Sequence, residues 1–134
     1  MVMASDCIFC KIVKDEIPST KVYEDEDFIA FMDIRPINIG QVLVIPREHY
    51  RWVYDVPNRG EYWEAANKVA EKVIKGLGAD HVSFVTLGHE IPHAHIWVVP
   101  RYADDGHGGF LDWSKAREAS REELDELASL IRKA

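Results

Sequence analysis

The sequence predicts an α+β fold built around a mainly antiparallel sheet of five strands. Segments rich in β-branched and aromatic residues lie close together along the chain, and one long amphipathic segment separates them. A second amphipathic segment ends the chain. Strands grouped in this way, rather than alternating regularly with helices, are typical of α+β domains. A chain of 134 residues has room for one sizeable core, so we assign residues 1–134 to a single domain.

Five short segments are predicted as strands. The stretch 21–34, KVYEDEDFIAFMDI, holds two apolar runs around an acidic turn and predicts two of them. The run 41–46, QVLVIP, is continuously apolar and predicts a largely buried strand. The segments 81–88, HVSFVTLG, and 93–100, HAHIWVVP, complete the set by their β-branched and aromatic content.

Two segments are predicted as helices. Residues 60–78 place small and apolar side chains three and four positions apart, and Gly76 and Gly78 are expected to end this helix. Residues 120–134 begin with Ser120 three positions before a glutamate, which is a capping-box pattern. Apolar residues then recur on one face of this second helix, namely Leu124, Leu127 and Ile131.

Composition limits the possible partners and locations. The net charge is −7, from 16 basic and 23 acidic residues, which argues against a nucleic-acid polymer because phosphate backbones require clustered Lys and Arg. A small phosphorylated ligand stays possible, since one pocket can be locally positive on an acidic protein. No apolar run approaches the roughly 20 residues of a membrane span. The first 16 residues become charged too early for a signal peptide, and two cysteines form no disulfide framework, so we expect a cytoplasmic protein.

The segment HEIPHAHIWVVPR, residues 89–101, concentrates three of the six histidines. Side chains in a strand alternate between faces, so one face would carry His93, His95, Trp97 and Val99, and the other face would be uniformly apolar. One interpretation is a solvent-facing strand on which histidine is simply tolerated. The other is a site, favoured because prolines bracket the strand and a glycine before it permits a close approach of the backbone.

This segment resembles the signature of the histidine-triad (HIT) family, in which a glycine leads through a proline into His-x-His-x-His, two apolar residues and Pro-Arg. The front half, CIFCKIVKDEIPSTKVYEDEDFIAFMDIRPINIGQVLVIPREHY (7–50), is similar to the N-terminal half of bacterial and archaeal HIT proteins. The resemblance covers about residues 7–101 and leaves 102–134 as a C-terminal extension. It implies a HIT-like fold, with the sheet continued across a homodimer.

The resemblance also implies site residues. His95 matches the family's nucleophile, His93 the first histidine of the triad, and Trp97 stands at the third position. Asp33 matches the acidic residue that holds the ribose hydroxyls. The apolar positions around the base correspond to Phe9, Ile12, Ile17, Phe31 and Ile34. From the residues alone, the favoured interpretations are a turn residue for Asp33 and ordinary core for the apolar set.

The chemistry expected of such a site follows from the side chains. A neutral imidazole nitrogen can attack the α-phosphorus of a nucleotide and form a nucleotidyl-histidine intermediate. The third histidine of the family lies near the leaving group, but the indole of Trp97 donates a hydrogen bond and cannot act as an acid or base near neutral pH. We therefore expect slower hydrolysis than a complete triad gives, although HIT branches with glutamine at this position act as nucleotidyl transferases. The segment before the triad is short, with Glu90 where the family has Ser or Thr, so no phosphate partner is assigned.

The CxxC pair at Cys7 and Cys10 has three interpretations: half of a zinc site, a redox pair, or two small buried residues. The redox interpretation is disfavoured because no thioredoxin-like βαβ pattern surrounds the pair. The HIT resemblance implies a structural zinc ion held by Cys7, Cys10, His49 and His93. The remaining histidines, His81, His89 and His107, are expected at the surface.

The function that these features favour is a hydrolase or transferase that acts at the α-phosphate of a purine nucleotide conjugate. Candidate substrates are nucleoside phosphoramidates, dinucleoside polyphosphates and adenylylated conjugates, and AMP is an expected ligand. The alternative is a non-catalytic purine-nucleotide-binding HIT protein in which the altered third position has left only the pocket. A weaker third hypothesis is a purely structural zinc protein.

Overall fold

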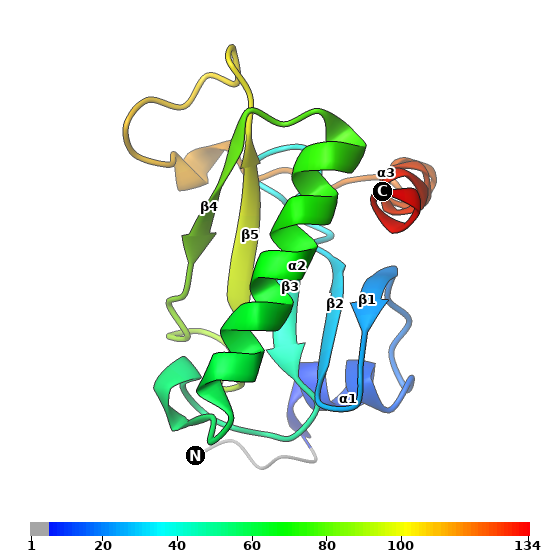
Figure 1. Cartoon of the computed structure of the whole chain (residues 1–134), viewed down its shortest axis with the longest axis vertical. Coiled ribbons are helices and arrows are strands. Elements are labelled where there is room, and N and C mark those ends of the chain that lie inside the picture. Colours follow the sequence, from blue (N-terminus) through cyan, green and yellow to red (C-terminus); the bar gives the residue numbers. More distant parts are fainter. Residues whose placement is uncertain (1–5) are drawn as a thin grey trace.

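The computed structural model describes residues 6–134. The predicted domain and the segment considered as a signal peptide both begin in residues 1–5, which lie outside the described residues. Figure 1 shows the order of the elements along the chain. Within residues 6–134, no helix is both long enough and apolar enough to cross a membrane. The α-helices and strands are α1 (Ile8–Val13), β1 (Lys21–Glu24), β2 (Phe28–Met32), β3 (Val42–Pro46), α2 (Arg59–Leu77), β4 (His81–Val85), β5 (Ile96–Arg101) and α3 (Arg121–Lys133), and two short 3-10 helices span Val53–Asp55 and Trp113–Lys115.

The predicted α+β fold is confirmed. The five strands form one sheet in the order β1-β2-β3-β5-β4, and every neighbouring pair is antiparallel. The acidic turn between β1 and β2 is closed by Asp25, whose carboxylate accepts hydrogen bonds from the backbone N–H groups of Asp27 and Phe28, each at 2.8 Å. β2 and β3 pair along their whole length, and β5 lies between β3 and β4, so the end of the histidine segment forms an interior strand of the sheet.

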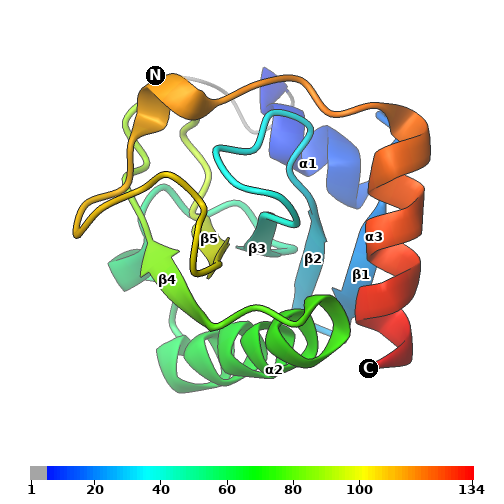
Figure 2. The same cartoon turned by 90° about the horizontal axis from the view of Figure 1, so that it is seen from above.

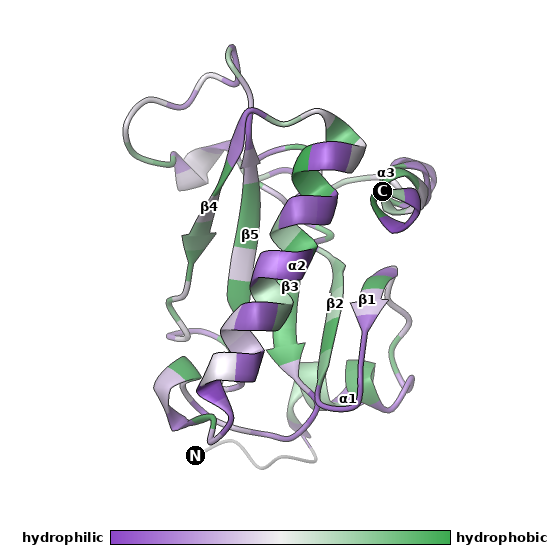
Figure 3. Cartoon of the chain, viewed as in Figure 1, coloured by the Kyte–Doolittle hydropathy of each residue, from purple (hydrophilic) through white to green (hydrophobic). Residues whose placement is uncertain are grey.

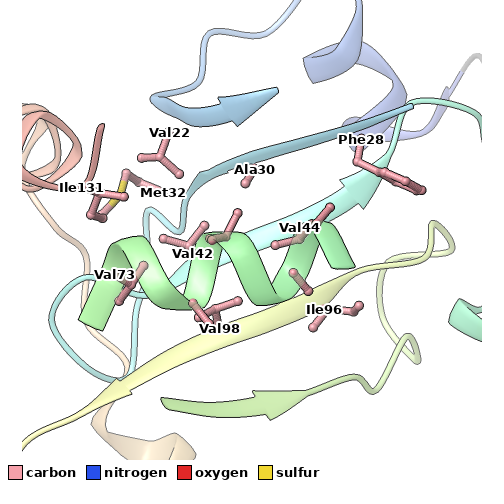
Figure 4. Close-up of a cluster of buried hydrophobic side chains, with 14 of the residues drawn as sticks. Val22, Phe28, Ala30, Met32, Val42, Val44, Val73, Ile96, Val98 and Ile131 are labelled. Atoms are coloured by element: carbon pink, nitrogen blue, oxygen red, sulfur yellow. The ribbon is translucent and has the colours of Figure 1, made fainter. Parts of the chain in front are cut away.

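The two faces of the sheet are covered by different helices (Figure 2). We call them the α2 face and the α1 face. α2 packs on the first face with a stripe of buried side chains, and its outer side is hydrophilic (Figure 3). That stripe meets Phe28, Ala30, Val44, Ile96 and Val98 in a core of apolar residues (Figure 4). The residues of α2 in the stripe are Tyr62, Ala65, Ala66, Val69, Ala70 and Val73.

One prediction about the C-terminal end of α2 is wrong. Gly78 ends the helix as expected, in the left-handed conformation at φ +67°. Gly76, predicted to be a second stop signal, instead lies inside the helix. A Cβ atom at Gly76 would lie 2.6 Å from the backbone oxygen of Leu130, so the glycine allows α3 to pack closely on α2. α3 begins as predicted at Ser120, whose hydroxyl accepts a hydrogen bond from the Glu123 N–H at 3.1 Å.

The α1 face carries a second apolar cluster, built by α1 against β2, β3 and β5. The sequence did not predict α1, because it is only six residues long and has no side chain capping its N-terminus. Its buried side chains fix it to the sheet instead. The buried members of the cluster are Cys7, Phe9, Cys10, Ile12, Ile29, Phe31, Leu43 and Ile45.

Two strands are shorter than predicted. β4 ends at Val85 rather than at residue 88, and β5 begins at Ile96 rather than at His93. The backbone before β5 is bonded elsewhere: the His93 N–H donates to the Ile91 oxygen at 2.9 Å and the Ala94 N–H donates to the Tyr50 oxygen at 2.7 Å. Both histidines therefore lie on an irregular segment that leads into the strand.

Candidate functional site

His93 and His95 are buried, with exposed fractions of 0% and 2%. The expected alternation still holds, since Ala94 and Ile96 enter the core on the α2 face while both imidazole rings contact Phe9 on the α1 face. The interpretation of a solvent-facing strand is therefore wrong. Burying two imidazoles is costly unless their polar atoms are bonded, so the partners of each ring nitrogen define what the pair can do.

Among residues 6–134, only one of the two ring nitrogens of His95 has a hydrogen-bond partner. Its Nδ1 lies 2.7 Å from the backbone oxygen of His93, and because a carbonyl only accepts hydrogen bonds, Nδ1 carries the proton. Burial lowers the pKa of His95; the bond to the His93 carbonyl and the charge of Asp33 oppose this shift, and the charge of Arg51 adds to it. The ring is thus neutral near pH 7, and its Nε2 lone pair is available to attack an electrophile.

Aromatic rings surround His95. The ring of Phe9 meets it edge-on at a centroid distance of 5.4 Å, and the indole of Trp97 does so at 4.7 Å. Trp97 in turn contacts Trp113 of the C-terminal extension at 5.1 Å. This last contact was not predicted, because nothing in the local sequence of the extension indicates where it crosses the sheet.

Cys7, Cys10, His49 and His93 converge on one point, and their four ligand atoms all lie within 4.8 Å of one another. Sγ of Cys10 lies 3.3 Å from Nδ1 of His49 and 3.5 Å from Nδ1 of His93, and Sγ of Cys7 lies 3.4 Å from the same His93 atom. A tetrahedral zinc ion with ordinary bond lengths separates sulfur and nitrogen ligands by roughly 3.5 Å. The four residues are therefore close enough, and of the right types, to hold a metal ion.

The bonding of His93 prepares it for this role. Its Nε2 lies 2.9 Å from the carbonyl oxygen of Pro46, so Nε2 carries the proton and Nδ1 faces the thiols with a free lone pair. Burial lowers the pKa of His93 to about 4, which keeps that lone pair available. Burial, with the neighbouring Cys7, raises the pKa of Cys10 to about 11. A divalent cation held by these residues would reverse that preference, because coordination favours the thiolate form of Cys7 and Cys10.

Asp33 lies at the end of β2, next to a cavity of about 710 Å³ between the loop that follows β2 and the C-terminal extension. Its carboxylate accepts hydrogen bonds from Gln41 Nε2 at 2.8 Å and from the Arg35 N–H at 2.9 Å. Two carboxylate oxygens accept about four hydrogen bonds, so Asp33 retains capacity for a further donor.

The other residues assigned to the nucleotide site lie in two environments. Phe9, Ile12 and Phe31 are buried in the cluster on the α1 face, and Ile17 packs against it. Ile34 differs from them in being 67% exposed. Four of the five residues therefore share one apolar cluster, and Ile34 contributes exposed apolar surface.

Arg51 is a neighbour of the site that the sequence did not single out. Its Nη1 donates to the backbone oxygen of Gly88 at 2.5 Å, and its guanidinium lies 4.1 Å from the ring centre of Trp52. Arg51 thus fixes the short segment before His93. Glu90, considered above for the phosphate position, is exposed. His107 is partly buried rather than superficial, since its two ring nitrogens bond to the Asp112 N–H and the Ile37 oxygen.

A model of the HIT domain matches residues 14–104 of the chain. The chain belongs to the HIT family. This match confirms the resemblance seen in the sequence. An uncharacterised HIT-like protein of Methanocaldococcus jannaschii is 38% identical over 133 residues, which are 94% of this chain and 98% of that protein. An adenosine 5'-monophosphoramidase of Saccharomyces cerevisiae is 33% identical over 126 residues, covering 90% of this chain and 77% of the yeast enzyme.

Solved structures of HIT proteins share the whole fold. A HIT-like protein from Bartonella henselae superposes with a TM-score of 0.85 at 31% identity, covering 99% of this chain and 98% of its own. A zinc-bound histidine triad family protein from Mycobacterium smegmatis superposes with a TM-score of 0.78, also at 31% identity, covering 98% of this chain and 94% of its own. The C-terminal extension is therefore part of a fold that these proteins share over nearly their full length.

Proposed function

We propose that this HIT protein cleaves the bond between the α-phosphorus of a purine nucleotide and its leaving group, with His95 as nucleophile. The observation that carries the proposal is the state of the His95 ring, which is neutral, oriented by the bond from its Nδ1 to the His93 carbonyl, and without a hydrogen-bond partner at Nε2 among the described residues. The name of the yeast relative, an adenosine 5'-monophosphoramidase, supports an adenosine phosphoramidate as substrate.

The reaction proceeds in two displacements. The Nε2 lone pair of His95 forms a bond to the α-phosphorus, and the bond to the leaving nitrogen or oxygen breaks with its electron pair on the leaving group. A water molecule then attacks the phosphorus, the N–P bond breaks, and its electron pair returns to His95. The leaving group takes a proton from solvent water as it departs in the first displacement, and the attacking water gives up a proton to solvent in the second. The products are a nucleoside monophosphate and the protonated leaving group.

Trp97 occupies the third position of the triad in this proposal. Its indole N–H donates a hydrogen bond but transfers no proton, so the leaving group receives its proton from water. We propose that Asp33 binds the ribose hydroxyls through its remaining acceptor capacity. The residues proposed to surround the base are Phe9, Ile12, Ile17, Phe31 and Ile34.

The metal held by the four-residue cluster is zinc in this proposal. Two thiols and two imidazoles are the donors that zinc prefers in structural sites, and a zinc-bound relative has the same fold. Cys7 and Cys10 belong to the N-terminal segment, His49 follows β3, and His93 leads into β5. An ion bound by all four residues joins these three segments and stiffens the backbone from which His95 projects.

We further propose a homodimer in which β4 pairs with its counterpart in a second copy. β1, at one edge of the sheet, is packed by α3, whereas β4 ends the sheet at the other edge. Phe84 on β4 and Trp63 on α2 stack edge-on at 5.7 Å and are 41% and 40% exposed, which is typical of an interface. Sedimentation of wild type and Phe84→Lys tests this: the wild type is expected to be a dimer and the variant a monomer, and a monomeric wild type contradicts the proposal.

A cytoplasmic location is part of the same proposal. Two free, buried thiols that are poised for metal binding suit a reducing compartment. Fractionation of cells that produce the protein checks this location.

The burial of His95 and the tryptophan at the third position favour a second candidate function, a protein that binds purine nucleotides without turning them over. Release of AMP from adenosine 5'-phosphoramidate separates the two. Wild type is expected to release AMP, and His95→Asn is expected to lose the activity by about 10⁴-fold or more. His89→Ala, which removes an exposed histidine of the same segment, serves as the matched control and is expected to match wild type. Binding of AMP without any release would favour the second function.

A further inference from the structure

One part of the proposed substrate, its α-phosphate, has no partner among the residues assigned above. Glu90, which stands where the family has Ser or Thr, is exposed and acidic, so its carboxylate repels a phosphate. His95 is the proposed nucleophile and Asp33 the proposed ligand of the ribose, and neither neutralises an anion. A partner for the phosphate must therefore come from another segment that lies against the histidines.

The segment after β3 lies against the histidine segment. The backbone oxygen of Tyr50 accepts a hydrogen bond at 2.7 Å from the N–H of Ala94, the residue between the two buried histidines. The side chain of Tyr50 packs against the core of the α2 face, whereas that of Arg51 bonds to the backbone just before His93. Both segments lie at the lower end of the sheet in Figure 1. Arg51 is thus held beside the chain that carries the nucleophile.

Only one nitrogen of the Arg51 guanidinium is hydrogen-bonded to residues 6–134. Nη1 donates to the backbone oxygens of Gly88 at 2.5 Å and of Ile91 at 3.4 Å. The Ile91 oxygen also accepts the His93 N–H, at 2.9 Å. Nε and Nη2 have no partner among these residues, and together they form an edge that can donate two parallel hydrogen bonds to one phosphate.

The charge of Arg51 is also unbalanced. Within the described part of the chain, no carboxylate forms an ion pair with it. The side chain is partly buried, and its guanidinium lies 4.1 Å from the ring centre of Trp52. An indole face and two carbonyls hold a cation in place but cancel none of its net charge. A partly buried cation without a counter-charge is costly, which indicates an anion as its partner.

His95 lies within the range of this charge. Burial is the main cause that lowers the pKa of His95, and the charge of Arg51 lowers it further. The charge of Asp33 opposes the shift, so a carboxylate and a guanidinium both act on the nucleophile. Of these two groups, only the guanidinium attracts the phosphate that joins the ribose to the leaving group.

We propose that Arg51 binds the non-bridging oxygens of the α-phosphate through Nε and Nη2, and so aligns the phosphorus with His95. This inference rests on the proposed function, because it assigns the phosphate partner of the same site. Nη1 keeps its bonds to the segment before His93, so one side chain fixes both the backbone that leads to the nucleophile and the group that is attacked. Arg51 transfers no proton, since a guanidinium stays charged in proteins.

The test separates binding of the phosphate from support of the backbone. Dissociation constants of adenosine, AMP and ADP are measured by equilibrium titration for wild type and for Arg51→Met, which removes the charge and keeps an unbranched side chain. Wild type is expected to prefer AMP to adenosine. Arg51→Met is expected to reduce that preference about 30-fold, since hydrogen bonds to a charged group contribute about this much, and to bind adenosine within about twofold of wild type. Arg51→Lys, which keeps the charge without the planar fork, is expected to fall between the two.

Arg59→Met is the matched control. Arg59 is an exposed arginine at the start of α2, and its Nη1 donates to the backbone oxygen of Tyr54 at 3.2 Å. It thus bonds to a carbonyl of the same loop that carries Arg51, but not to the histidine segment. All three dissociation constants are expected to match those of wild type.

Three outcomes would overturn the inference. Equal losses of affinity for AMP and adenosine in Arg51→Met would show that the side chain only supports the backbone. An unchanged preference for AMP would show that other groups hold the phosphate. A loss with ADP but not with AMP would move the guanidinium to the second phosphate.

Failure of this inference is distinct from failure of the proposed function. Release of AMP from adenosine 5'-phosphoramidate, together with an unchanged preference for AMP in Arg51→Met, would reject the inference and keep the proposed function. A preference for AMP that Arg51→Met loses, without any release by wild type, would keep the inference and reject the proposed function. Absence of AMP binding by wild type would overturn both.

Discussion

The two faces of the sheet are made by the same strands but differ in role. The α2 face forms the hydrophobic core, and the α1 face carries the candidate site. On the α2 face, the side chains that meet α2 from the three central strands are apolar, and they close a core around Tyr62. On the α1 face, the alternate side chains of the same strands cluster with Cys7 and Cys10, and Trp97 of β5 meets the ring of His95. The period of two along a strand thus separates stability from chemistry within single segments. A shift of one residue at the start of β5 would exchange the two faces.

Removal of the proposed zinc ion is expected to have the largest effect, because its four proposed ligands come from three segments of the chain on the α1 face. A zinc ion present at 1,000 times its dissociation constant adds about 4 kcal/mol to the free energy of unfolding. Chelation of wild type should therefore lower Tm by roughly 10–20 °C. Calorimetry before and after chelation measures this. Cys10→Ser should start at the lower Tm and show no response to the chelator; an equal response in both proteins would contradict the proposed ligand set.

Trp97→His tests the chemistry proposed for the α1 face, namely whether protonation of the leaving group limits turnover. A histidine at this position can protonate the leaving group, and general acid catalysis contributes about 10²-fold or more. We expect faster release of AMP from adenosine phosphoramidates of saturated amines, with the largest gain for the most basic amine. Initial rates across a series of amines give the measurement. No gain for any amine would mean that proton transfer at the third position does not limit turnover.

Ile96→Val tests the α2 face of the sheet, at the residue that precedes Trp97 in β5. Ile96 is fully buried on the α2 face, and removing one methylene there costs about 1 kcal/mol. Denaturant unfolding should show this loss, while kcat and KM for the phosphoramidate stay within about twofold of wild type. A large change in kcat would show that the two faces are coupled through the backbone of β5.

The sequence predicted the elements that carry regular patterns. α2 and α3 have apolar residues at helical spacing, the capping Ser120 is where the pattern required it, and the five strands follow runs of β-branched and aromatic residues. α1 has too few residues for such a pattern. Gly76 was misjudged because its role depends on α3, more than fifty residues away. Local composition does not report a contact of that kind.

The site was predictable to a similar degree. The metal-ligand cluster follows from the CxxC pair and the family resemblance, and the structure brings its four residues together. The tautomers of His93 and His95 depend on carbonyls of Pro46 and His93 that only the folded chain presents. The contact between Trp97 and Trp113 depends on the path of the extension, which hydrogen bonds to the loop after β2 determine.

The central claim is that His95 forms a covalent bond to the nucleotide, and trapping that bond tests it most directly. Wild type is mixed with adenosine 5'-phosphoramidate and quenched in base within milliseconds to seconds, because phosphohistidine-type bonds are labile in acid. Intact mass and peptide mapping then locate any added group. The expected result is one adenylyl group on His95, present in His89→Ala and absent from His95→Asn. Release of AMP from wild type at full rate with no adduct at any time, or with unchanged release by His95→Asn, would contradict the account.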